Sequence, residues 1–167
     1  MKVEVPELQA IADRIVAQAK SGEQIEAYVG RGGDTSVRVY EGELEHFVSA
    51  QSEGVGIRVI KNGRTGTAYA GTLDEQAIAE VLAEARDNVQ FGTEDEFAGL
   101  ATPDGVEPVP QKFWDDELAG YPTEGKVDLT KDLERRALAA DPRVRTESAN
   151  YDDGWGETAF ATTTGSR

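Results

Sequence analysis

The glycine-rich stretch "EGVGIRVIKNGRTGTAYAG", residues 53–71, is the first place where residue types and spacing could support chemistry, namely phosphate binding. Its "GVGIRV" lacks the third glycine of a dinucleotide-binding fingerprint, and its "GRTGT" lacks the lysine of a P-loop. Phosphate binding also needs a helix N-terminus after the glycines, whereas this stretch has the residue pattern of a β-hairpin. The glycines are therefore predicted to serve turning and packing.

Metal and thiol chemistry is limited by composition, because the sequence contains one histidine, His46, and no cysteine. Disulfides and a zinc site with two histidines of its own are therefore excluded within this sequence. His46 lies between Leu44 and Val48 in an alternating stretch, which indicates a residue on the face of a sheet. A catalytic role for this imidazole would need a serine or cysteine partner brought in from elsewhere.

Paired carboxylates are the remaining candidates for acid–base work, at Asp115-Asp116 and Asp152-Asp153. Adjacency in sequence does not make two carboxylates share a proton, and such pairs are common in an acidic chain. The segment "NYDDGWGE", residues 150–157, resembles a calcium loop, but its glycine and its glutamate stand at the wrong positions for one. We therefore predict no catalytic, cofactor-binding or metal-ligating residue in this sequence.

The charge of the chain restricts its partners. It has 32 acidic and 17 basic residues, a formal net charge of −15, and its one basic cluster, "ERR" at residues 134–136, stands among acidic residues. Such a surface repels nucleic acid and anionic lipid, so neither is an expected partner. The N-terminal residues are broken by charges, unlike a signal peptide, and no apolar run approaches the roughly 20 residues that span a bilayer. We expect a soluble, cytoplasmic protein.

The N-terminal half of the chain predicts a helix followed by an antiparallel meander. Apolar residues recur at helical spacing after Pro6, and Gly22 is a plausible stop. Strands are then expected around residues 25–29, 37–39 and 44–48, separated by turns at residues 32–34 and near 41–42.

The next hairpin turns at Asn62-Gly63, which is typical of a two-residue type I′ turn. Counting outward from it pairs Ile57 with Ala68 and Val59 with Gly66, so branched residues face minimal ones and leave room for a helix close to the sheet. A helix follows directly, with a predicted capping box at Thr72 and Glu75 and an apolar stripe of Leu73, Ala77, Ile78, Val81, Leu82 and Ala85.

The C-terminal half predicts a second, incomplete unit. Residues 92–125 are rich in proline and form a predicted linker, pinned down by Phe113, Trp114, Leu118 and Tyr121. A helix over residues 127–140 that carries Leu129, Leu133 and Ala137 is expected, and then a hairpin at Asp153-Gly154. The predicted fold class is α+β, with an N-terminal domain over residues 1–91, the linker, and a truncated second domain over residues 126–167.

Residues 35–85, "TSVRVYEGELEHFVSAQSEGVGIRVIKNGRTGTAYAGTLDEQAIAEVLAEA", resemble the N-terminal domain of the TldD/PmbA family, also known as modulators of DNA gyrase. The segments "FGTEDEFAGLATPDG" and "WDDEL" are similar to the PmbA-like (TldE-like) branch. This resemblance implies a cytoplasmic metallopeptidase (hydrolase) complex that acts in proteolysis of peptides or unfolded segments. It also implies a heterodimer in which a TldD-like partner holds zinc through a His-Glu-x-x-x-His motif and a downstream cysteine, none of which occurs here.

Two functions follow as hypotheses. The first is an N-terminal fragment of a TldD/PmbA-like subunit, without metal ligands of its own, that works with a metal-bearing partner on a peptide substrate. The alternative is a free-standing acidic α+β module that binds peptides or proteins without hydrolysis. In either case the exposed edges of the sheet could bind an extended peptide by strand addition.

Overall fold

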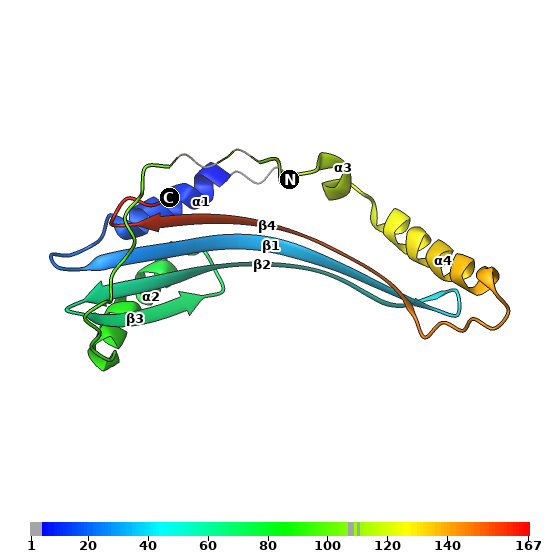
Figure 1. Cartoon of the computed structure of the whole chain (residues 1–167), viewed down its shortest axis with the longest axis horizontal. Coiled ribbons are helices and arrows are strands. Elements are labelled where there is room, and N and C mark those ends of the chain that lie inside the picture. Colours follow the sequence, from blue (N-terminus) through cyan, green and yellow to red (C-terminus); the bar gives the residue numbers. More distant parts are fainter. Residues whose placement is uncertain (1–4, 107–108, 110) are drawn as a thin grey trace. The chain divides into compact units, whose positions relative to one another are not determined.

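The computed structural model describes residues 5–106, 109 and 111–167, which form helices around one open antiparallel sheet (Figure 1). The sheet has four strands in the order β3-β2-β1-β4, so the predicted α+β class is confirmed. In chain order the elements are α1 (Val5–Val16), β1 (Gln24–Tyr40), β2 (Glu43–Lys61), β3 (Arg64–Ala70), α2 (Glu75–Asn88), the 3-10 helix η1 (Val89–Phe91), α3 (Asp116–Ala119), α4 (Thr123–Ala140) and β4 (Ala149–Thr162). None of the described helices is both long and apolar enough to cross a membrane.

The hairpin of β2 and β3 has the predicted register. Asn62 and Gly63 have φ of 52° and 71°, which is the left-handed conformation that a type I′ turn requires at both positions. Ile57 pairs with Ala68 and Val59 with Gly66, as counting outward from the turn predicts. The local turn chemistry therefore fixes which residues of β3 face inward.

The small residues of β3 admit a helix at very short range. A Cβ added at Gly66 would lie 2.2 Å from the carbonyl oxygen of Ala85 and 2.4 Å from the backbone nitrogen of Val89. The predicted close approach of a helix is confirmed, and the predicted apolar residues Ile78, Val81, Leu82 and Ala85 of α2 are buried. The predicted capping box is wrong, because Asp74 is the N-cap residue and no side chain caps the helix.

One turn predicted from glycine is absent from this part of the chain, because a strand runs straight through it. The predicted turn at residues 32–34 lies inside β1, and the predicted strand at 44–48 is part of β2. Neither Gly32 nor Gly33 has a positive φ, and a Cβ added at Gly33 would lie 2.7 Å from the indole nitrogen of Trp155. Gly33 therefore makes room for an aromatic ring. The predicted turn at Glu41-Gly42 is confirmed, with φ of 51° and 79°.

The predicted hairpin at Asp153-Gly154 is also wrong. Both residues lie inside β4, a continuous strand that adds to the sheet beside β1. Gly154 does not have a positive φ, and a Cβ there would lie 2.8 Å from Oδ1 of Asp34. Asp-Gly is a turn signal only where the chain reverses, and here the glycine accommodates a neighbouring side chain.

The described residues form two compact units, each assembled from separate segments. Unit 1 comprises residues 5–31, 52–106 and 156–167, and unit 2 comprises residues 32–51, 109, 111–155. The predicted division into 1–91, a 92–125 linker and 126–167 stays a prediction. The two units group residues that are close in space, and each unit combines segments that are separate in the sequence. Within the predicted linker lie α3 and the first residues of α4.

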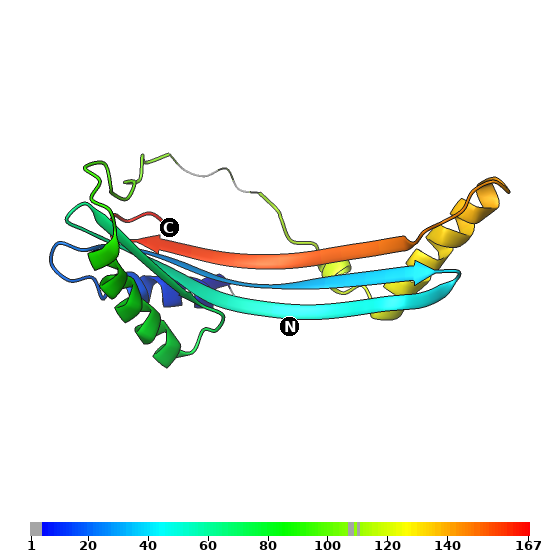
Figure 2. The ribbon, with the colours of Figure 1, turned by 90° about the horizontal axis from the view of Figure 1, so that it is seen from below.

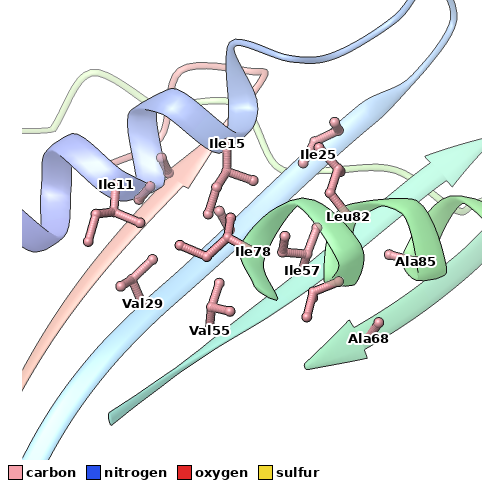
Figure 3. Packing of buried hydrophobic residues seen from close by; sticks show 14 of the residues in the cluster. Ile11, Ile15, Ile25, Val29, Val55, Ile57, Ala68, Ile78, Leu82 and Ala85 are labelled. Atoms are coloured by element: carbon pink, nitrogen blue, oxygen red, sulfur yellow. The ribbon is translucent and has the colours of Figure 1, made fainter. Parts of the chain in front are cut away.

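The hydrophobic core of unit 1 lies between the sheet and the helices α1 and α2 (Figure 3). Leu8, Ile11 and Ile15 of α1 meet Ile25 and Val29 of β1 there, together with the buried face of β2 and α2. Residues at every second position of β1 and every third or fourth position of the helices are buried, as these periods require. α1 ends at Val16, before the stop predicted at Gly22.

Candidate functional site

The single histidine lies on an exposed part of β2 in unit 2. All side chains of β2 from Glu43 to Glu53 are exposed, so His46 lies at the surface. The described residues offer its imidazole neither a hydrogen bond nor an ion pair, and they contain no group of three or more side chains able to hold a metal. Among the described residues, no serine or threonine hydroxyl is hydrogen-bonded to His46.

The carboxylates of the first predicted pair have different partners. Asp115 Oδ1 accepts hydrogen bonds from the backbone nitrogens of Glu117 at 2.8 Å and Leu118 at 3.1 Å, so it caps α3. These bonds lower the pKa of Asp115. Asp116 instead accepts a bond from the indole nitrogen of Trp114 at 3.0 Å. Asp115 therefore caps a helix and Asp116 binds an indole, so the two carboxylates have separate structural roles.

The second pair is divided in the same way. Asp153 accepts a hydrogen bond of 2.5 Å from the Tyr151 hydroxyl and pairs with Lys126 Nζ at 2.7 Å, while Asp152 is exposed. Burial raises the pKa of Asp153, but the bonds from Lys126 and Tyr151 outweigh this and lower it overall. The bond to Asp153 raises the pKa of Tyr151 to about 12. This cluster of α4 and β4 was not predicted, since Lys126 stands alone in the sequence.

A buried carboxylate organises the other end of α4. Glu134 is 1% exposed and accepts bonds from the backbone nitrogens of Glu41 at 3.1 Å and Gly42 at 2.7 Å, and from the Thr146 hydroxyl at 3.0 Å. It therefore fixes the turn between β1 and β2. The sequence grouped it with Arg135 and Arg136, but those two are exposed and pair with Asp132.

The backbone of β2 has an open edge in unit 2. Its pairing with β3 extends from Lys61 to Val55, and among the described strands none lies on that side of residues 43–51 (Figure 2). Leu44, Phe47 and Val48 in this stretch are 44%, 39% and 39% exposed. An open edge offers unpaired backbone donors and acceptors in the geometry of a strand. This edge, residues 43–51, is the candidate functional site.

These features define an α+β protein with an open sheet. Along the edge of β2 at residues 43–51, backbone groups as well as side chains can contact a partner. Two models of one family match this chain in order: PmbA/TldA metallopeptidase domain 1 over residues 25–89, and the PmbA/TldA metallopeptidase central domain over residues 116–167. The chain therefore belongs to the TldD/PmbA family, which confirms the family predicted from residues 35–85.

Individual relatives agree with this assignment. Metalloprotease PmbA of Escherichia coli O157:H7 is 26% identical over 161 residues, which cover 94% of this chain and 35% of that protein. A protein of Thermotoga maritima described as a modulator of DNA gyrase has a TM-score of 0.76 at 25% identity, covering 93% of this chain and 35% of its own. TldE from Thermococcus kodakarensis shares the fold, with a TM-score of 0.75, 18% identity and coverage of 97% and 35%.

The chain thus spans 35% of the length of these relatives. The comparisons establish the family and the fold over that length. The assignment to the PmbA-like branch, the zinc of a partner subunit and the absence of site residues in this chain stay predictions.

Proposed function

We propose that this chain is part of a TldD/PmbA-type subunit that takes part in peptide hydrolysis together with a metal-bearing partner in the cytoplasm. The observation that carries the proposal is the ordered match to domain 1 and to the central domain of a metallopeptidase family. The sequence contains no His-Glu-x-x-x-His motif, so in this proposal zinc is held by a TldD-like partner. This chain contributes a scaffold and a peptide-binding surface.

The test is reconstitution with the TldD-like protein of the same genome. We expect the two proteins to copurify through a tag on either one, and the mixture to cleave an unstructured peptide, as measured by mass spectrometry. Each protein alone and the mixture treated with a chelator are the controls. Failure to copurify, combined with cleavage that is unchanged by adding this chain, would contradict the proposal and favour a free-standing binding module.

A second candidate function, peptide binding without hydrolysis, is favoured by the open edge of β2. An extended peptide can pair with this edge because both partners present free backbone groups every second residue. A basic peptide is the best probe, since the chain carries a net charge of −15. Glu43 and Glu45 at the edge add to this field, although Glu45 pairs with Arg38 at 2.7 Å and Glu43 with Lys131 at 3.8 Å.

Backbone methylation of the probe tests strand addition directly. Two alternating Lys/Val peptides are methylated on the backbone nitrogens of odd or of even residues, so that composition and charge are equal. If the peptide adds as a strand, one methylation phase abolishes binding and the other preserves it, and amide NMR shifts concentrate in residues 43–51. Equal affinity of the two peptides would contradict strand addition at this edge.

A further inference from the structure

Unit 1 contains a cavity of about 610 Å³. Three segments line it: the loop after α1 with Lys20 and Glu23, the turn between β2 and β3, and the end of α2. A volume of this size lies within the range of about 300–1,000 Å³ typical of small-molecule sites. No motif in the sequence predicts it, because its walls are distant in the chain.

Positive charge gathers in this cavity. Its lining includes four basic residues, Lys20, Lys61, Arg64 and Arg86, and two acidic residues, Glu23 and Asp87. Four positive and two negative charges give the lining a net charge of +2. The whole chain has a net charge of −15 and only 17 basic residues. A cationic cavity in so acidic a protein is the opposite of what the average composition predicts.

Arg86 is held in a fixed orientation by a buried partner. Glu23, whose side chain is 4% exposed, accepts bonds from Arg86 Nε at 3.2 Å and Nη2 at 3.1 Å, and Nη2 also donates to the Gln18 carbonyl at 2.7 Å. Burial raises the pKa of Glu23, but the bond from the Lys20 backbone and the contacts with Arg86 lower it overall, so it stays ionised. Among the described residues, no acceptor binds Arg86 Nη1.

The opposite wall is also anchored. Arg64 Nη1 donates to the Gly92 carbonyl at 3.2 Å, and its Nη2 pairs with Glu94 at 3.6 Å, a carboxylate outside the lining that offsets part of the positive charge. The backbone nitrogen of Asp95 donates to the Gly63 carbonyl at 2.8 Å. These bonds connect the β2–β3 turn to the segment after η1. Two guanidinium groups are therefore positioned before any ligand arrives, which lowers the ordering cost of binding.

A purely structural role explains only part of this arrangement. Arg86 and Arg64 bind carbonyls near helix ends, where cations complement the helix dipole. Lys20 has no such acceptor among the described residues, and Lys61 forms only a long ion pair of 3.8 Å with Glu23, which Arg86 already shares. Four cations thus share fewer carboxylates, and a bound anion would offset the repulsion that remains.

We infer that this cavity binds a small phosphate-bearing anion. Arginine guanidinium groups match phosphate oxygens with two parallel hydrogen bonds, and lysines add point charges around them. The positive lining suits a small anion, and the volume of about 610 Å³ admits one larger than inorganic phosphate. The inference concerns unit 1 alone and holds whether or not the chain acts in peptide hydrolysis.

The test is titration of the full chain with sodium pyrophosphate, followed by calorimetry, with sodium sulfate at equal ionic strength as the reference anion. We expect one saturable site with a Kd below about 1 mM, and weaker binding of sulfate. The variant Lys61→Gln/Arg64→Gln should bind at least about tenfold more weakly. The matched control Arg143→Gln/Arg145→Gln changes the net charge equally but lies in unit 2 and should stay within about twofold.

A second variant guards against misfolding of the first. Lys20 is exposed and its ammonium group pairs with no group among the described residues, so Lys20→Gln should keep the fold and still weaken pyrophosphate binding about threefold. The absence of saturable binding up to about 10 mM pyrophosphate would overturn the inference. Equal weakening in the cavity variants and in the unit 2 control would overturn it as well, because that result indicates general electrostatic attraction only.

Discussion

Replacement of Gly66 by alanine tests how closely α2 approaches the sheet. The added Cβ would lie 2.2 Å from the Ala85 oxygen, 2.4 Å from the Val89 nitrogen and 2.8 Å from the Asn88 carbonyl carbon. All three are backbone atoms, so no side-chain rotation can relieve the contacts. Since favourable contacts begin near about 3.5 Å, the helix must move away from β3 by about 1 Å.

The cost can be worked from this displacement. Inserting a methyl group into a packed core costs about 1–3 kcal/mol, and the upper end applies because the obstacle is backbone. The change from glycine also restricts the unfolded chain, which returns about 0.4–1 kcal/mol. The expected net loss is about 2 kcal/mol, or about 4–8 °C in Tm for a chain of this size.

Gly56 provides the matched control in the same hairpin. It pairs with Tyr69, and a Cβ added there would have no heavy atom within 4 Å. In urea unfolding followed by circular dichroism, Gly56→Ala should stay within about 0.5 kcal/mol of the parent while Gly66→Ala shifts to lower urea. Coincident midpoints for the two variants would refute the proposed contact between α2 and β3.

Three further predictions concern buried or bonded acids. Glu134→Gln leaves one backbone donor of the β1–β2 turn facing an amide NH₂, so we expect a loss of about 2–3 kcal/mol and faster hydrogen exchange at Gly42. Asp153→Asn should return the pKa of Tyr151 from about 12 toward 10.0 in an ultraviolet titration. In the parent protein, the stability contributed by the Tyr151–Asp153 hydrogen bond is fully present below pH 10 and should be lost as the pH rises toward 12. Because the pKa of Glu23 is lowered, its contribution to stability is present above the ordinary pKa of 4.5 and is lost as the pH falls through the lower pKa of the folded state. In urea unfolding, Glu23→Gln should remove this part of the pH dependence of stability.

The sequence predicted the β2–β3 hairpin correctly because its specification is local. Asn62 and Gly63 adopt positive φ at little cost, and once the turn is set, the two-residue period fixes every pair from Ile60–Thr65 to Val55–Ala70. The same period placed Gly66 on the buried face. The helix α2 followed from its own apolar spacing. Each of these features depends on residues within about one turn or strand of each other.

Long strands were missed because glycine was interpreted as a turn residue. Gly33 and Gly154 both lie in extended backbone, and their missing Cβ atoms make room for Trp155 and Asp34, respectively. Those neighbours come from the other strand, more than a hundred residues away in sequence. A glycine that avoids a clash and a glycine that allows a turn have the same local appearance, so only the fold separates them.

The burial of side chains on α4 does not follow their polarity. Leu129 and Leu133, the leucines that the sequence places on this helix, are 49% and 53% exposed, whereas Thr130 and Glu134 are each 1% exposed. Glu134 is turned inward because its carboxylate binds the backbone of a turn 92 residues earlier in the chain. Burial of a charge is favourable only with such partners, and no helical period reveals them.

Net charge is a sum, whereas binding depends on the field at one place. The value of −15 predicts repulsion of nucleic acid because a long polyanion meets many surface carboxylates at once. At physiological ionic strength charges beyond about 8 Å are largely screened, so a small anion inside the unit 1 cavity responds mainly to its lining. That lining has a surplus of +2 and an arginine oriented by the buried Glu23. A chain can therefore repel extended polyanions over most of its surface and still bind a small one, because the two ligands sample different groups of charges.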